Sequence, residues 1–255
     1  MTGTRIRTAM VLAAGLGKRL RPFTAARPKP LVAVHGKTLI DWTLDRLFAA
    51  GIEHVVINTH YLAPMLQEHL AARDDAAALT VLYEPDLLET GGGVVNALDH
   101  LGPDPFLVTN SDSILIDGFQ AHMPEITACW DPAEMDALLL LVPTVTGLGY
   151  DGAGDFSMRP DGRLQRRKRP LPAPFVYTGT QVLKPDLFQG CRAEPFSLNR
   201  TFDEALASNR LYGMRHQGDW LHIGSPDGLA EAEAYLRDMI RSHQKPAGTL
   251  PLFGG

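Results

Sequence analysis

The stretch MVLAAGLGKRLRPFTAARPKPLV, residues 10–32, begins as a buried strand and then breaks into a glycine turn at Gly15 and Gly17. Glycine permits positive φ, so successive backbone N–H groups of such a turn can converge on an anion. Five cationic side chains follow the first glycine: Lys18, Arg19, Arg21, Arg27 and Lys29. A strand that leads into a cationic, glycine-containing loop indicates a phosphate-binding site.

The first half of the chain alternates strands with helices. Runs rich in β-forming residues are Thr8–Leu12, His54–Asn58, Leu79–Tyr83 and Phe106–Thr109. Segments with helical spacing lie between them: Thr38–Ala50 with Gly51 as C-cap, Leu62–Arg73, and a helix from near Gly92 to Leu101. This order is typical of a parallel sheet with helices on both faces. We therefore expect an α/β protein, a Rossmann-like three-layer α/β/α sandwich with a mostly parallel central sheet.

The second half of the chain continues the sheet in our prediction. The apolar run Ala137–Val142 is typical of a strand buried on both faces, and Asp155–Gln165 carries a hairpin turn signal at its centre. Three further strands should extend the same sheet: Pro174–Val182, Leu211–His216 and Trp220–Ile223. A final helix is expected over Pro226–Arg241, followed by a flexible tail over residues 244–255 that is rich in Pro and Gly.

Composition excludes several classes of partner. The 255 residues carry a net charge of −5, which argues against general binding to nucleic acid or to an acidic membrane surface. The two cysteines, Cys129 and Cys191, show no CxxC spacing, so neither a disulfide framework nor a zinc site is indicated. No segment has the length of a membrane span or a signal-peptide core. We expect a cytoplasmic protein with no nucleic-acid or membrane partner.

Two common phosphate loops do not fit the glycine turn. The third glycine of a dinucleotide-binding fingerprint would fall at Leu20, and the P-loop pattern fails because Arg19 follows Lys18. A dinucleotide-binding dehydrogenase would also need an acidic residue at the end of the second strand. The sequence has Asn58-Thr59-His60 there, which excludes that class.

The residues after the turn resemble the signature of the sugar-1-phosphate nucleotidyltransferases. The match consists of Gly15-x-Gly17-x-Arg19-x-Arg21-Pro22-x-Thr24 followed by Pro28-Lys29-Pro30-Leu31. Three later segments are similar to the family's base-binding turn, metal-binding strand end and closing motif: Leu88–Gly93, Asn110–Asp112 and Trp220–Ser225. The resemblance implies a GT-A-like fold in one domain over 1–243. Its nucleotide-binding half would be 1–112 and its sugar-binding half 113–243.

The resemblance also implies roles for individual residues. Arg19, Lys29 and Asp112 would be catalytic, and Asp112 would hold Mg²⁺. Residues that would bind the nucleotide are Leu12, Ala14, Gly15, Gly17, Lys18, Glu84, Thr90, Gly91 and Asn110. Residues that would bind the sugar are Asp155, Thr178 and Gly179, although Asp155 could instead bond to its own backbone.

His222 departs from the family pattern. It stands where the family has a second metal-binding Asp, and an imidazole is a poor Mg²⁺ ligand. Either Asp112 holds Mg²⁺ with help from the triphosphate, or the preferred metal is Mn²⁺ or Co²⁺. The missing carboxylate also leaves open a degenerate relative that binds nucleotide sugars as a regulatory protein.

Within the family, the compact length and the Glu89–Gly93 segment look most like the N-acetylmuramate 1-phosphate uridylyltransferases of cell-wall recycling. This favours UTP and N-acetylmuramate 1-phosphate as substrates. The alternative is a guanylyltransferase acting on mannose or heptose 1-phosphate. The basic run Arg166–Arg169 could contact a sugar carboxylate or form a solvated hairpin edge. We expect a monomer or a homodimer.

Overall fold

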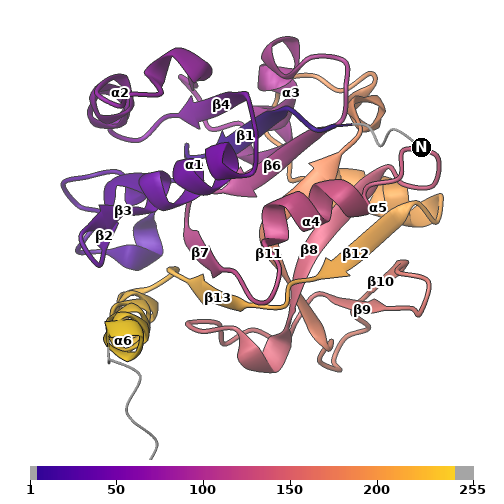
Figure 1. The fold of residues 1–255 in the computed structure, drawn as a ribbon. Helices are drawn as coiled ribbons and strands as arrows, with labels where there is room; N and C mark the ends of the chain where they lie inside the picture. The colour runs from indigo at the N-terminus through magenta and orange to yellow at the C-terminus, as the bar shows by residue number, and fades with distance from the viewer. Residues whose placement is uncertain (1–4, 245–255) are drawn as a thin grey trace, which may run out of the picture.

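The computed structural model describes residues 5–244 and contains a nine-stranded mixed sheet (Figure 1). Its four strands from the first half of the chain run parallel in the order β5-β4-β1-β6. Their bounds are β1 (Thr8–Leu12), β4 (His54–Thr59), β5 (Leu79–Tyr83) and β6 (Phe106–Asn110). Because β4 and β6 flank β1 on opposite sides, the chain adds strands first on one side of β1 and then on the other, which makes β1 a topological switch point. Ligands of open α/β sheets bind at the carboxyl ends of strands at such a switch point.

The second half of the chain adds antiparallel strands beside β6. The long β11 (Phe175–Leu183) pairs antiparallel with β6 and with β8 (Ala137–Pro143), and β12 (Leu211–Arg215) pairs parallel with β8. The predicted hairpin is present as β9 (Phe156–Met158) and β10 (Leu164–Arg166). Gly162 supplies the positive φ that its turn requires.

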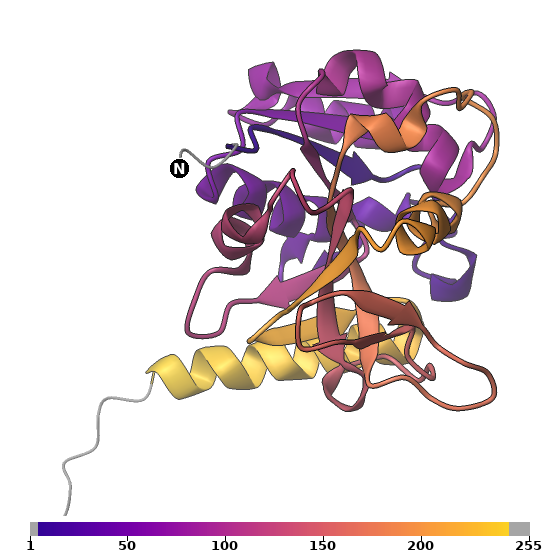
Figure 2. The same cartoon turned by 90° about the vertical axis from the view of Figure 1, so that its right-hand side faces the viewer.

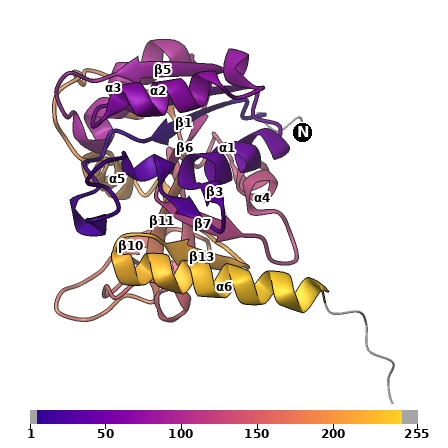
Figure 3. The ribbon, with the colours of Figure 1, turned by 90° about the vertical axis from the view of Figure 1, so that its left-hand side faces the viewer.

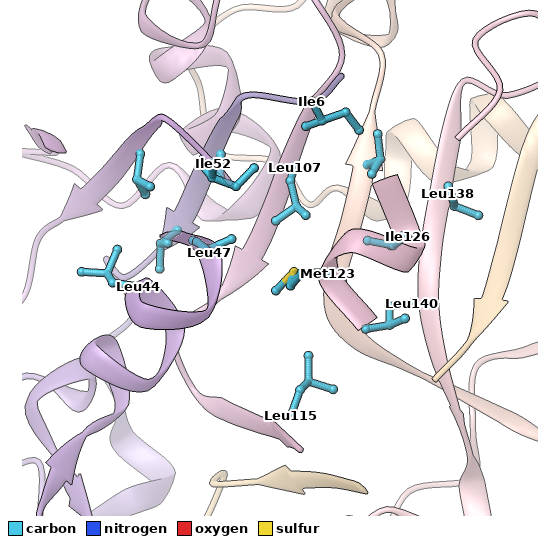
Figure 4. Packing of buried hydrophobic residues seen from close by; sticks show 14 of the residues in the cluster. Ile6, Leu44, Leu47, Ile52, Leu107, Leu115, Met123, Ile126, Leu138 and Leu140 are labelled. Atoms are coloured by element: carbon cyan, nitrogen blue, oxygen red, sulfur yellow. The ribbon is translucent and has the colours of Figure 1, made fainter. Parts of the chain in front are cut away.

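Helices cover both faces of the sheet, which confirms the expected α/β/α architecture (Figures 2 and 3). One face packs against α1 (Leu39–Ala49), α2 (Ala63–Ala71) and α4 (His122–Cys129), and Figure 4 shows part of this core. The other face packs against α3 (Glu89–Leu101) and α5 (Asn199–Ala207). Helix α1 begins as the sequence predicts, because the Thr38 hydroxyl accepts a hydrogen bond from the Asp41 N–H.

A separate two-stranded ribbon corrects one prediction. The strand near Trp220–Ile223 exists as β13 (Asp219–His222), but it does not extend the central sheet. It pairs antiparallel with β7 (Ser113–Ile116), a strand that the sequence analysis did not foresee. The ribbon packs on α6 (Pro226–Gln244), which crosses below it in Figure 3. A second small ribbon joins β2 (Ala33–Val34) to β3 (Lys37–Thr38).

Other element boundaries differ from expectation in small ways. Helix α3 begins at Glu89, three residues before the predicted start at Gly92, so the glycine triplet belongs to its first turns. Helices α4 and α5 were not predicted. The expected flexible tail over 244–255 lies outside the described residues except for Gln244. No helix within residues 5–244 has the length and apolar character needed to cross a bilayer.

Candidate active site

The glycine loop after β1 folds back onto the Pro-Lys-Pro segment. Gly17 has φ +61°, and a Cβ there would lie 3.0 Å from the Thr24 methyl carbon and 3.1 Å from the Lys29 Cβ. The Thr24 hydroxyl donates a 2.8 Å hydrogen bond to the Gly17 carbonyl. Two elements of the sequence signature, the glycine turn and the segment around Lys29, are therefore held together by direct contact.

The backbone of this loop is open to an anion. The Ala13 N–H donates to the Asn58 side chain, and the next loop N–H with an acceptor is that of Leu20, which donates to the Gly17 carbonyl. Between them, the N–H groups of residues 14–19 have no acceptor within the described part of the chain. A Cβ on Gly15 would meet no atom within 4 Å. Unpaired N–H groups around open space are suited to phosphate oxygens.

An ion pair links this loop to the end of β6. The Lys29 Nζ lies 2.9 Å from Asp112 Oδ2, and the two side chains are 12% and 26% exposed. Burial acts to raise the pKa of Asp112, but the positive charge and hydrogen bond of Lys29 outweigh it, so that this pKa lies below its usual range. Asp112 is therefore an anion at neutral pH, and its negative charge holds the Lys29 ammonium group in place.

His222 and Arg19 complete the cluster that begins with Lys29 and Asp112. The register of the ribbon places His222 opposite Ser113, next to Asp112, and the Ile223 N–H donates to the Asp112 carbonyl at 3.1 Å. Burial lowers the pKa of His222, so its imidazole is neutral at pH 7. Arg19 is exposed and lines a cavity of about 540 Å³ together with His222. Arg19, Lys29, Asp112 and His222 thus converge at one edge of the sheet.

A second cavity, of about 400 Å³, lies on the other side of this cluster. Lys29 and Asp112 line it, with six of the predicted nucleotide-binding residues: Leu12, Ala14, Gly15, Glu84, Thr90 and Asn110. The predicted residues Gly17, Lys18 and Gly91 do not line it. Glu89, which also lines it with φ +55°, lies in the expected base-binding segment but was not assigned a role of its own. Sequence reasoning missed Ser197, which comes from a loop far away in the sequence.

A buried chain of hydrogen bonds supports one wall of the smaller cavity. The Asn58 amide accepts from the Ala13 N–H at 2.8 Å and donates to Glu84 Oε1 at 2.8 Å. Glu84 is 1% exposed, and its Oε2 has no hydrogen-bond partner of good geometry in the described part of the chain. Burial raises the pKa of Glu84. A carboxyl group with a free oxygen at the wall of a cavity is suited to receive an N–H group of a ligand.

The glycine triplet 91–93 makes room for neighbouring parts of the protein. A Cβ on Gly91 would lie 2.3 Å from the Phe196 ring, and one on Gly92 would lie 2.1 Å from the Glu194 carbonyl oxygen. A Cβ on Gly93 would lie 2.9 Å from the Asn58 amide nitrogen. We call residues 194–198 the strap, since this segment lies across the start of α3. It is fixed there by the Gly91 N–H, which donates to the Phe196 carbonyl at 2.8 Å.

Thr90 fastens the other end of the strap. Its hydroxyl oxygen accepts from the Leu198 N–H at 2.9 Å. Thr90 and Gly91 therefore have structural contacts that the sequence analysis did not include. The N–H groups of Glu89 and Thr90, which precede Gly91 in the first turn of α3, have no acceptor within residues 5–244.

The residues expected to bind the sugar have partners within the protein. The Thr178 hydroxyl, 2% exposed, donates to the Leu140 carbonyl at 3.0 Å, and Asp155 Oδ2 accepts from the Tyr177 N–H at 3.0 Å. Gly179 has φ +92° and packs against Asn110, whose Nδ2 would lie 2.5 Å from a Cβ. None of the three lines the two cavities. Tyr150, in a glycine-rich loop that the analysis had not singled out, lines the larger one.

The basic run 166–169 divides into two parts. Arg166 donates to Asp203 at 2.9 Å and to the Asn199 side chain at 2.9 Å, and its guanidinium stacks on the Phe156 ring. Arg167 pairs through its backbone N–H with the Asp155 carbonyl at 2.9 Å, which places it on the opposite face of the hairpin from Arg166. Its guanidinium has no ion-pair partner among the described residues.

A family model described as nucleotidyl transferase matches residues 8–146, more than half of the chain. The chain belongs to the nucleotidyl transferase family. A curated relative from Caulobacter vibrioides, N-acetylmuramate alpha-1-phosphate uridylyltransferase, is 42% identical over 234 residues, covering 90% of this chain and 97% of the relative. A protein of the same name from Neisseria meningitidis serogroup B is 36% identical, covering 89% and 96%. These findings confirm the family that the signature suggested.

More distant relatives agree with this assignment. A mannose-1-phosphate guanylyltransferase catalytic subunit beta from Drosophila pseudoobscura pseudoobscura is 26% identical and covers 96% of this chain and 65% of the relative. A crystal structure of UDP-glucose pyrophosphorylase complexed with UDP-glucose superposes with a TM-score of 0.75 at 17% identity, over 92% of this chain and 100% of that one. The similarity to the UDP-glucose pyrophosphorylase structure supports the fold of this nucleotidyl transferase.

The glycine triplet generates a prediction for this nucleotidyl transferase. Gly92→Ala should lower the free energy of unfolding by about 1–3 kcal/mol, since its Cβ would overlap the Glu194 backbone, which cannot rotate away. Gly15→Ala is the matched control, because the new methyl group would enter open space. Urea denaturation of both variants measures the difference, and equal stabilities would contradict this account of the strap.

Proposed function

We propose that this nucleotidyl transferase joins UTP to N-acetylmuramate 1-phosphate, giving a nucleotide sugar and pyrophosphate. The observation that carries the proposal is the convergence of the open loop, Arg19 and the Lys29–Asp112 pair at the switch point of the sheet. A reaction between two phosphoesters uses all of these groups. The identities to the two uridylyltransferases support the choice of substrates.

The residues would act by positioning anions and neutralising their charge. An oxygen of the sugar phosphate attacks the α-phosphorus of UTP, and the bond from that phosphorus to pyrophosphate breaks on the far side. Two unit charges 4 Å apart repel by about 4 kcal/mol at an effective dielectric of 20. The loop amides and Arg19 would bind the departing pyrophosphate, and Lys29 would lie between the α-phosphate and the sugar phosphate. No covalent enzyme intermediate is required.

The donor set fits a divalent cation shared with the substrate. Mg²⁺ is commonly held by one or two carboxylates together with substrate phosphates. Asp112 Oδ1 makes no hydrogen bond within residues 5–244, while Oδ2 is engaged by Lys29. Within residues 5–244, no three His, Cys, Asp or Glu side chains are placed to hold a metal ion. Asp112, with His222 beside it, would therefore share the cation with triphosphate oxygens. The bound cation would supply positive charge to the phosphates.

The wall of the smaller cavity favours uracil over guanine. Uracil presents one N–H between two carbonyl groups, whereas guanine presents two adjacent N–H donors beside its carbonyl. Asn58 occupies Oε1 of Glu84, whereas Oε2 has no hydrogen-bond partner of good geometry among the described residues, although the Leu88 N–H also approaches this carboxyl group. The unpaired N–H groups of Glu89 and Thr90 can donate to a base carbonyl. One acceptor beside donors matches the uracil pattern.

Arg167 is the candidate partner for the carboxylate that distinguishes N-acetylmuramate from N-acetylglucosamine. It is half-buried, has no ion-pair partner in the described chain, and lies close enough to Tyr150 for its charge to oppose the rise in the Tyr150 pKa that burial causes. Tyr150 lines the larger cavity beside Arg19 and His222. Arg166 is engaged elsewhere, so we assign the carboxylate to Arg167.

A substrate matrix tests the proposed function. UTP and GTP are each combined with the 1-phosphates of N-acetylmuramate, N-acetylglucosamine, mannose and heptose, and pyrophosphate release is measured with Mg²⁺, Mn²⁺ or Co²⁺. We expect the fastest turnover with UTP and N-acetylmuramate 1-phosphate. Arg167→Gln should raise the KM for this sugar about tenfold and leave that for N-acetylglucosamine 1-phosphate unchanged, with Lys168→Gln as control. Binding of UTP without pyrophosphate release from any pair would instead favour a regulatory protein.

The charged cluster generates a second prediction. Lys29→Ala and Asp112→Ala should each lower kcat at least about a hundredfold, the effect of losing one preorganised contact of about 3 kcal/mol. Lys168→Ala, which removes an exposed cation outside the cavities, should leave kcat within twofold of the wild type. Melting curves establish that the variants are folded. Near-normal turnover in either of the first two variants would remove that residue from the mechanism.

His222 generates a third prediction. His222→Asp should shift the metal that supports the fastest turnover toward Mg²⁺, since a carboxylate oxygen is a harder ligand than an imidazole nitrogen. His222→Asn is the matched control for His222→Asp, because asparagine has the shape of aspartate and carries no charge. Turnover of the three proteins is compared across Mg²⁺, Mn²⁺ and Co²⁺. Identical metal profiles for wild type and His222→Asp would exclude a role of His222 at the metal.

A further inference from the structure

The β7–β13 ribbon carries functional groups at one end only. Its near end holds Asp112, directly before β7, and His222, the last residue of β13. A two-stranded ribbon is marginally stable by itself, and neither strand belongs to the central sheet. The near end has local support, since the His222 N–H donates to the Leu148 carbonyl at 2.8 Å and Asp112 follows β6, so contacts at the far end decide how the remainder of the ribbon is set.

A buried histidine holds the far end of the ribbon. His216 is 2% exposed, and its Nε2–H donates to the Ile116 carbonyl at 3.0 Å and the Asp219 carbonyl at 3.3 Å. These two residues are register partners, one from each strand. The His216 backbone N–H donates to the Leu141 carbonyl at 2.7 Å. One residue thus ties both strands of the ribbon to β8 of the central sheet.

The surrounding contacts leave little freedom at this end. A Cβ on Gly218 would lie 1.9 Å from the Ile116 carbonyl oxygen, so backbone lies directly on backbone there. Asp117, which follows β7, accepts from the His122 ring and from Arg46 of α1 at 3.3 Å. The rings of His122 and His216 meet edge to face, with centroids 5.0 Å apart. The far end is thereby joined to α1 and α4 as well as to β8.

The hydrogen bonds also assign the tautomers of the two imidazoles. The His216 Nδ1 and the His122 Nε2 are buried and have no hydrogen-bond partner among the residues that the structure describes. His216 must carry its proton on Nε2 to donate to the two carbonyls, and His122 must carry its proton on Nδ1 to donate to Asp117. Burial lowers the pKa of both residues, that of His122 to about 4, so both are neutral at pH 7. His216 is thus a fixed donor.

We propose that His216 is a positioning residue: by clamping Ile116 and Asp219 it fixes the ribbon and, through it, the placement of Asp112 for nucleotidyl transfer. The clamp lies at the opposite end of the ribbon from Asp112, so it acts without touching substrate. The N–H groups of the open loop and Arg19 follow β1 directly, and Leu20 after them packs with Ile114 and Leu221 toward the near end of the ribbon, away from the clamp. Loss of the clamp should therefore affect turnover more than nucleotide binding.

His216→Leu, which keeps the volume and removes the donor, tests the proposal against His216→Gln, which retains an N–H donor. We expect kcat of the Leu variant to fall about tenfold with the KM for UTP within twofold of wild type, and the Gln variant to recover most of the loss. His100→Leu, on an exposed position of α3, is the control. Assays run well below each melting temperature. An unchanged kcat in the Leu variant, or no recovery with Gln, would overturn the proposal.

Amide hydrogen exchange gives a readout that needs no substrate. The turnover assay rests on the proposed function, and wild-type protein inactive with every substrate pair would refute that function alone. In His216→Leu, exchange should quicken in peptides covering 113–116 and 219–222 and stay unchanged in β1. Unchanged exchange in the ribbon would overturn the clamp. If the Leu variant does not fold, His216→Asn replaces it, because the asparagine side chain is one methylene shorter than that of glutamine and its donor does not reach the carbonyls. Amide exchange in the ribbon equal to that of the Gln variant would then overturn the clamp.

Discussion

The ion pair between Lys29 and Asp112 is the interaction around which the site is arranged. The two residues are 83 positions apart and meet because β1 and β6 are parallel neighbours whose carboxyl ends share one edge of the sheet. Both charges are largely withdrawn from water, and their attraction offsets that cost only while they remain paired. The pair therefore holds a cation at the mouth of the loop before any phosphate arrives. The Ser111 hydroxyl, donating to the Leu12 carbonyl at 2.9 Å, keeps the two strand ends together.

Elements whose causes are local could be predicted from the sequence. Strands β1 and β5 begin and end at the predicted residues, and α1 begins at its Thr38 cap, because apolar runs and capping residues decide them within a few positions. The start of α3 could not be predicted in this way. Three glycines are poor helix formers, and the strap that accepts the Gly91 N–H is about a hundred residues away. The pairing of β13 with β7 is likewise a long-range choice.

The candidate site likewise contains residues that the sequence predicts and residues that it does not. Arg19, Lys29 and Asp112 belong to motifs, and the structure brings them together as a motif with a fixed geometry should. Residue letters do not say where a side chain points. The register of β11 against β8 shifts between Tyr177 and Gln181, and the Thr178 hydroxyl meets the Leu140 carbonyl inside the sheet instead of facing a cavity. Tyr150 and Ser197 lie in loops whose course depends on tertiary contacts, and no local pattern identifies them.

The histidine at position 222 affects the charge of the site. Arg19 and Lys29 supply two positive charges and Asp112 one negative charge, while burial keeps His222 neutral. These four side chains together carry one positive unit, while Asp151, Asp227 and Glu231 line the same cavity as Arg19 and His222. Among the described residues, Asp112 is the carboxylate that pairs with Lys29. A carboxylate at position 222 would add a further negative charge beside them, whereas the neutral imidazole adds none. It therefore leaves the attraction of Arg19 and Lys29 for phosphate undiminished.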